Sequence, residues 1–222
     1  MTLPAISDDG TSAAAETTDS GGSGSSGAAV ICGDNVAAGD EECDNDLDPA
    51  CHDCIRDRRI FVTAPPEFTA DLGSMEEADD ECNYRAAVAG LIDPSTYPFK
   101  AWLSTQGSSA ANRMFHSRGR YVLTSGDIFA PSWDGLVAGQ IFHAPEFDEY
   151  GEPQSLGVWT GTLPDGAAAP GTNCDDWTTL SLEGKATWGL SDGVGATWTQ
   201  WTDPDTNPTD CLSSMAFYCV EQ

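Results

Sequence analysis

Four cysteines near the start of the chain are the residues whose spacing says most about chemistry. Cys32, Cys43, Cys51 and Cys54 lie within 23 residues that contain too few apolar side chains to form a core, so cross-links or a metal ion must hold them together. The ten, seven and two residues between successive cysteines differ from the paired CxxC spacing of zinc ribbons. We therefore expect disulfides, with zinc, held by the thiolates or by His52, as the alternative. The spacing does not determine the pairing.

Alternating aspartates in the same segment point to a second chemistry, calcium binding. Asp44, Asp46 and Asp48 have the spacing with which an EF-hand loop begins, and Ca²⁺ prefers carboxylate oxygens. Pro49 stands where that loop requires glycine, and Ile55 stands where it requires a bidentate glutamate. A looser calcium site is therefore the candidate, with solvated carboxylates that bind nothing as the alternative.

The net charge narrows the classes of partner. The 222 residues include 36 acidic and 9 basic ones, a formal charge of −27. Such a chain repels nucleic acid and anionic lipid and attracts Ca²⁺ and basic partners. The alternative is a charge that only keeps the surface soluble. No run of 18 apolar residues is present, so we expect no transmembrane segment.

The residues that enzymes of common classes need are not found in recognisable patterns. The histidines are His52, His116 and His143, and the chain contains no HExxH, GxSxG, P-loop or dinucleotide fingerprint. We therefore expect no enzyme. A hydrolase that uses a pair of carboxylates needs no histidine and stays as the third-ranked hypothesis.

Composition divides the chain into three parts. Residues 1–29 are rich in Ser, Gly, Thr, Ala and Asp and should form a flexible tether. They lack the basic start and apolar stretch of a signal peptide, so the targeting signal of an exported protein is not visible in this chain. Residues 30–57 form the acidic cysteine-rich segment, and residues 58–222 are typical of a globular domain.

The elements of this third part predict an α+β fold. Strands are expected at 59–63, 99–103 and 215–219, and many short strands and turns after residue 121. Ser74 and Glu77 form a capping box for a helix that Gly90 ends, with Ala78, Cys82, Ala86 and Ala89 on one stripe. A second short helix is expected at 108–115.

The cysteines of the third part resemble those of C-type-lectin-like domains. Cys82 lies in the first predicted helix, and Cys211 and Cys219 are separated by seven residues, the spacing usual for the final pair of such domains. The resemblance implies the disulfides Cys82–Cys219 and Cys174–Cys211. Residues alone leave three pairings open.

A second resemblance covers about three quarters of the chain. Residues 59–222 are similar to bacterial endostatin-like domains of unknown function, and the motifs that carry the similarity are Phe61-Val62-Thr63, Lys100-Ala101-Trp102-Leu103-Ser104, His116-Ser117, Tyr121-Val122-Leu123, Val158-Trp159-Thr160-Gly161-Thr162, Asn173-Cys174-Asp175-Asp176-Trp177-Thr178 and Tyr218-Cys219-Val220-Glu221-Gln222. The preceding segment, from Cys32-Gly33-Asp34 to Cys51-His52-Asp53-Cys54, resembles the cysteine-rich repeats of myxobacterial-type surface proteins. The resemblances imply a lectin-like fold and a location outside the cell.

Sugar-binding C-type lectins hold Ca²⁺ with Glu-Pro-Asn and Trp-Asn-Asp elements, and this chain departs from both. Glu152-Pro153-Gln154 and Trp201-Thr202-Asp203 have Gln and Thr where those lectins have Asn, and Thr is the poorer ligand. Glu152, Asp203 and Asp205 are nevertheless the candidate calcium ligands of this domain, with solvated turns as the alternative.

The tryptophans divide into two expected groups. Trp102, Trp159 and Trp177 lie in the family-like motifs and are expected in the core. The Gly- and Asp-rich surroundings of a loop are found around Trp133, Trp188, Trp198 and Trp201. Of these, Trp133, Trp198 and Trp201 are the candidates for contact with a ligand.

The sequence thus predicts a secreted or cell-surface-tethered bacterial binding or adhesion module that recognises a protein or a glycan through the loops of a lectin-like domain. The alternative is a structural surface-layer or appendage subunit that self-associates through bridging calcium.

Overall fold

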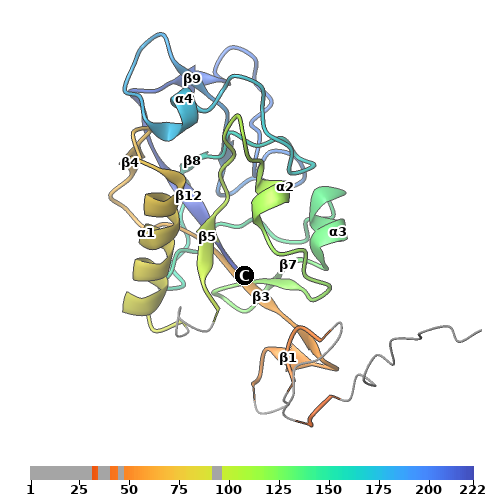
Figure 1. The fold of residues 1–222 in the computed structure, drawn as a ribbon. Coiled ribbons are helices and arrows are strands. Elements are labelled where there is room, and N and C mark those ends of the chain that lie inside the picture. The colour runs from red at the N-terminus through yellow and green to blue at the C-terminus, as the bar shows by residue number, and fades with distance from the viewer. Residues whose placement is uncertain (1–31, 35–40, 45–47, 92–96) are drawn as a thin grey trace, which may run out of the picture.

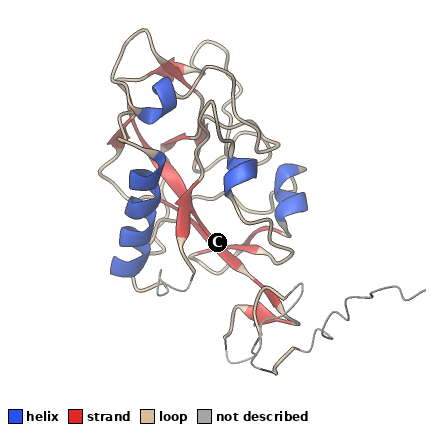
Figure 2. Ribbon diagram, in the orientation of Figure 1, coloured by secondary structure: helices blue, strands red, loops and turns tan. Residues whose placement is uncertain are grey.

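The computed structural model describes residues 32–34, 41–44, 48–91 and 97–222. The predicted tether and Asp46 lie outside these residues. Within the described part, the architecture is mixed α and β, with mostly short strands, few helices and long loops (Figure 2). The predicted α+β class is confirmed at this level.

Eight strands of the described residues form one sheet around the C-terminal strand. The path runs β10 (Trp188–Leu190), β8 (Gly157–Trp159), β12 (Ser214–Glu221), β3 (Arg58–Val62), β6 (Tyr121–Leu123) and β7 (Ile128–Ala130). The short strands β4 (Phe68–Thr69) and β5 (Phe99–Ala101) also pair with β12. Two further pairs lie outside this sheet, namely β1 (Cys51–His52) with β2 (Ile55–Arg56), and β9 (Lys185–Ala186) with β11 (Thr209–Asp210).

The central strand separates two hydrophobic cores because successive side chains of a strand point to opposite faces. Ala216, Tyr218 and Val220 lie in one core, whereas Phe217 and Cys219 lie in the other. The antiparallel partner β3 places Ile60 and Val62 in the first core and Phe61 in the second. This alternation explains why β12, which is buried on both faces, contains an almost unbroken apolar run.

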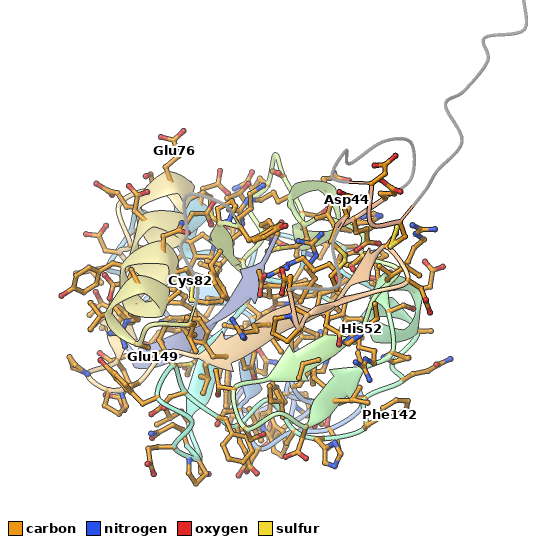
Figure 3. The ribbon with its side chains drawn as sticks, turned by 90° about the horizontal axis from the view of Figure 1, so that it is seen from below. Asp44, His52, Glu76, Cys82, Phe142 and Glu149 are labelled. Atoms are coloured by element: carbon orange, nitrogen blue, oxygen red, sulfur yellow. A yellow bond between two sulfur atoms is a disulfide. The ribbon has the colours of Figure 1, made fainter. Side chains whose placement is uncertain are left out.

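The long helix α1 (Met75–Val88) covers the second core. Ser74 caps it by accepting a hydrogen bond from the Glu77 N–H at 3.1 Å, and Ala78, Cys82 and Ala86 are its buried residues. Figure 3 shows Cys82 on the inner side of the helix and Glu76 pointing away from the molecule. The predicted cap and apolar stripe are confirmed, except that Ala89 is only half-buried.

The other helices are one or two turns long. They are α2 (Ala110–Arg113), α3 (Trp133–Val137) and α4 (Cys174–Trp177). Helix α2 is the core of the helix predicted at 108–115, and the strands predicted at 59–63, 99–103 and 215–219 appear with ends shifted by one to two residues. In Figure 1, α1 lies on one side of the central strands and α2 and α3 lie on the other.

Candidate binding surface

The cysteine-rich segment is held by two disulfides and sits on the larger domain. Cys32 pairs with Cys54 and Cys43 with Cys51, so its thiols are not available as zinc ligands. Glu42, buried in this segment, accepts hydrogen bonds from Ser117 Oγ at 2.6 Å and the Arg118 N–H at 2.7 Å. The segment therefore continues the larger domain through a buried polar interface.

A buried ion pair strengthens the same interface. The Arg56 guanidinium, 2% exposed, donates to Glu221 Oε1 at 2.8 Å from Nη2. Glu221 is the end of β12, and its other oxygen accepts from the Arg59 N–H at 3.0 Å. A buried charge is costly unless it is paired, so the position of the cysteine-rich segment is specific.

The aspartates predicted as calcium ligands in this segment have other partners. Asp48 accepts hydrogen bonds from the Arg56 guanidinium and from the Ala50 N–H at 2.9 Å. Burial acts to raise the pKa of the Asp48 carboxyl, but the Ala50 N–H and Arg56 outweigh it and hold that pKa below its ordinary value. Asp44 Oδ1 accepts from the Gly33 N–H at 3.1 Å. Asp46 lies outside the described residues.

The late calcium candidates lie in surface turns. Asp203 Oδ1 accepts from the Asp205 N–H at 3.0 Å, and Glu152 is exposed with its N–H bound to Asp148 Oδ1 at 3.0 Å. Among the residues that the structure describes, no three His, Cys, Asp or Glu side chains are grouped so as to hold a metal ion.

Two of the three tryptophans that are candidates for contact with a ligand lie in the core. Trp198 is 1% exposed, with its ring centroid 4.9 Å from that of Trp102. Trp133 is 6% exposed, and the His116 ring stacks on it at 4.1 Å. Trp201 is half-buried beside Trp188. Glycine and aspartate near an aromatic residue indicate a loop, but a loop can still place its aromatic side chain in the core.

The predicted core tryptophans are confirmed. Trp102, Trp159 and Trp177 are all completely buried. The indole N–H of Trp177 donates to the Ser104 carbonyl at 2.9 Å, and that of Trp159 donates to the Phe68 carbonyl at 3.0 Å. Buried indoles need such acceptors, and these two bonds attach the late loops to the N-terminal half of the domain.

The disulfides of the larger domain are Cys82–Cys219 and Cys174–Cys211, the pairs that the lectin resemblance implies. The first joins α1 to the central strand. The second joins α4 to the end of β11 across 37 residues of the chain. All eight cysteines are therefore paired, as is typical of proteins from oxidising compartments.

The residues at α4 form a left-handed turn that the sequence does not reveal. Cys174, Asp175, Asp176 and Trp177 have φ between 51° and 66°. This conformation costs roughly 1–2 kcal/mol for each residue that has a Cβ. The Cys174–Cys211 disulfide, the burial of Trp177 and a hydrogen bond from the Gln106 N–H to Asp176 Oδ1 at 2.7 Å hold it.

Three exposed leucines gather beside this turn, and sequence reasoning missed them. The Cys211 N–H donates to the Ser181 carbonyl at 3.1 Å, which places the backbone at Leu212 close to the backbone at Leu180 and Leu182. The three side chains are 48%, 50% and 69% exposed in that order. We call this group, Leu180, Leu182 and Leu212, the leucine tip. Leucines that appear in a polar, turn-rich stretch could have signalled it.

The leucine tip and the cysteine-rich segment lie at opposite ends of the molecule. Figure 1 shows α4 and β9, which flank the tip, at the upper end and β1 at the lower end. Asp175 and Glu183 are exposed beside the leucines. The exposed Lys185 of β9 lies in the same segment, so exposed leucines occur with charged residues of both signs at this end.

Comparison with known proteins adds no family. No protein-family model matches the chain, and no curated protein matches it. In the described residues, no helix is long and apolar enough to cross a membrane.

Proposed function

We propose that this chain is a cell-surface binding module that recognises a protein partner through its late loops. The observation that carries the proposal is the leucine tip, which lies at the end of the molecule opposite the cysteine-rich segment (Figure 1). Exposed apolar side chains that are grouped rather than scattered mark interaction surfaces. The N-terminal part would attach the module, and the far end would meet the partner.

The rigidity of the tip supports this role. A disulfide, the hydrogen bond from the Trp177 indole to the Ser104 carbonyl and the pairing of β9 with β11 fix the loops that carry the leucines. A preformed surface loses little conformational entropy when it binds, so more of the contact energy appears as affinity.

A protein partner fits the side chains better than a glycan does. Sugar-binding sites use exposed aromatic rings, and two of the three candidate rings, Trp133 and Trp198, lie in the core. Leucines contact apolar protein surface. With a formal charge of −27, the module favours a partner of basic character.

The lectin-like fold is the second part of the proposal. The strands near the two ends of the domain, β3 and β12, pair antiparallel, and a disulfide joins the first helix to the last strand. A second disulfide lies within the late loops. These features agree with the C-type-lectin-like arrangement that the cysteine spacing implies, in which the late loops are the binding surface.

Selection from a displayed peptide library tests the proposed function. The oxidised full chain alone is the target of selection, and the selected peptides are then measured against the double variant Leu180→Ser/Leu182→Ser. We expect selected peptides to bind the parent chain and to lose affinity for the tip variant. Peptides whose binding ignores the tip would place the binding surface elsewhere.

A further inference from the structure

A cavity lies on the outer side of the domain between β4 and the first half of α1. Its volume is about 210 Å³, and its lining includes Phe68, Asp71, Leu72, Glu77, Glu81 and Phe217. About 10–15 Å³ is enough for a cavity to hold one water, so this cavity has room for a side chain. None of the roles described above uses it.

The floor of the cavity is aromatic. The ring centroids of Phe68 and Phe217 are 4.8 Å apart, and Phe217 is completely buried beneath the half-buried Phe68. Leu72 and Ala78 add aliphatic surface. Such a floor attracts methylene groups, and the Arg85 guanidinium already lies over the Phe68 ring, 5.1 Å from its centroid.

The carboxylates at the mouth of the cavity are not neutralised. Asp71 and Glu77 are exposed, and neither side chain makes a hydrogen bond or ion pair within the described residues. Glu81 does bind Arg85, with Nε to Oε1 at 2.7 Å. Arg85 is also bound to the buried Glu149 at 2.8 Å, so it cannot compensate the other two carboxylates.

The chain has almost no cation left to fill this mouth. Its nine basic residues all lie in the described part, and eight are held by internal contacts. Six of them bind carboxylates, namely Arg56, Arg58, Arg85, Arg113, Arg118 and Arg120. The other two, Arg59 and Lys100, bind backbone carbonyls. Among the described residues, Lys185 alone has no such contact. Within the described residues, Lys185 is thus the one basic side chain that is left over.

We propose that this cavity binds the lysine or arginine side chain of a basic partner protein. The methylene groups would lie on Phe68 and Leu72, and the charged end would meet Asp71 and Glu77. The wall of the cavity contacts the proposed binding end, because the Leu72 N–H donates to the Trp177 carbonyl of α4 at 2.8 Å. The proposed function is the basis for taking the molecule that bears this side chain to be a protein. The preference of the cavity for a basic side chain does not depend on the proposed function.

Small amides test the cavity without any partner. The probes are N-acetyl-lysine methylamide and N-acetyl-arginine methylamide, with N-acetyl-norleucine methylamide as the uncharged control. Binding to the oxidised full chain is followed by the amide NMR shifts of Thr69, Leu72 and Ala78. We expect saturable shifts with one or both cations. Removal of one carboxylate, in Glu77→Gln or Asp71→Asn, should weaken binding about two- to fivefold, as for exposed ion pairs.

The matched control is Glu76→Gln. Glu76 is exposed on the same turn of α1 but does not line the cavity, so its loss should leave the affinity unchanged. Equal weakening by Glu76→Gln would mean that only the general negative field attracts the probe. Equal shifts with the norleucine amide, or no saturable shift with either cation, would also overturn the proposal.

Two further results separate this inference from the proposed function. If library peptides need the leucine tip but the amides do not bind, the cavity proposal fails and the binding module stands. If the amides bind and no peptide needs the tip, the proposed function fails and the cavity proposal stands. Self-association that Lys185→Ala abolishes would make a second copy the occupant and overturn the basic partner.

Discussion

Trp198 shows how far a single residue can differ from its local sequence. Its neighbours are those of a surface loop, yet its ring packs on Trp102, Phe129 and Tyr218 at centroid distances of 4.9, 5.1 and 5.3 Å. Trp201, three residues later, is only half-buried. The two positions therefore differ in energetic role although they look alike in the sequence.

We expect Trp198→Ala to lower the free energy of unfolding by about 3–5 kcal/mol, because it leaves a large cavity in a closely packed core. Trp201→Ala should cost far less. Denaturant unfolding of the oxidised protein measures both changes. Equal costs at the two positions would mean that the first core is not packed as described.

Asp48 gives a prediction about pH. Its folded-state pKa lies below the ordinary value of 3.8, so its ion pair with Arg56 stabilises the fold above that pH and is lost as the pH falls through the folded pKa. We expect Asp48→Asn to be less stable than the parent at about pH 7 and the difference to shrink as the pH falls through the folded-state pKa of Asp48. Denaturant midpoints across this range measure it.

The exposed Asp80, for which the structure shows no hydrogen bond or ion pair, supplies the control Asp80→Asn. Its stability should follow that of the parent at every pH. A deficit of Asp48→Asn that persists unchanged in acid would contradict the assignment of the effect to the ionised carboxylate.

At the scale of elements, the sequence predicts what local physics decides. The α1 cap, its buried stripe and the strands near both ends of the domain follow from side-chain type and periodicity, and the structure contains them. The short elements α3 and α4 could not be predicted, because long-range contacts stabilise them. The left-handed turn at 174–177 in particular opposes local preference and depends on Cys211, Gln106 and the burial of Trp177.

For the candidate surface too, some features can be predicted from the sequence and others depend on long-range contacts. Acidic residues and cysteines are visible in the sequence, but which carboxylates are free depends on the fold: Asp48 is paired, whereas Asp71 and Glu77 are not. The leucine tip forms only because the Ser181 and Cys211 segments meet. No pattern along either segment contains that contact.

Removing the late disulfide should release the strained turn. Cys174→Ala/Cys211→Ala opens a 37-residue loop, which corresponds to about 4 kcal/mol of chain entropy. We expect faster amide hydrogen exchange from residue 174 to 184 and loss of binding at the leucine tip. Hydrogen exchange with denaturant unfolding measures these effects.

The control for this change is Cys43→Ala/Cys51→Ala, which opens the smaller loop of the cysteine-rich segment. It should lower stability but leave exchange and binding at the tip unaltered. If the tip exchanges slowly without Cys174–Cys211, then other contacts hold the turn.

At the scale of the whole molecule, the protein has two different ends and a formal charge of −27. The cysteine-rich segment is attached through the buried Glu42 and the Arg56–Glu221 pair, and the leucine tip lies at the far end (Figure 1). Glu149, labelled in Figure 3, binds both Arg85 and the Ala64 N–H beside α1. Such buried pairs leave the remaining carboxylates as a strongly negative surface.

Calcium separates the binding module from the structural-subunit alternative. We expect the chain to keep the same size with Ca²⁺ and with chelator, because the partner that we propose for the tip is a different molecule. Light scattering measures the size of the protein, and thermal unfolding reports whether Ca²⁺ binds. If a site exists, Ca²⁺ at ~100 times its Kd would raise the free energy of unfolding by roughly 2.7 kcal/mol. Assembly that depends on Ca²⁺ would favour the structural subunit.

The affinity of one library-selected peptide for three proteins tests the central claim most directly. These are the parent chain, the tip variant Leu180→Ser/Leu182→Ser, and the control Tyr84→Ser/Val88→Ser, which removes two exposed apolar side chains from α1. Burying a leucine contributes about 1.5–3 kcal/mol, so the account predicts at least about tenfold weaker binding to the tip variant. It predicts unchanged binding to the α1 variant. Equal affinity for parent and tip variant, with both proteins folded, would contradict it.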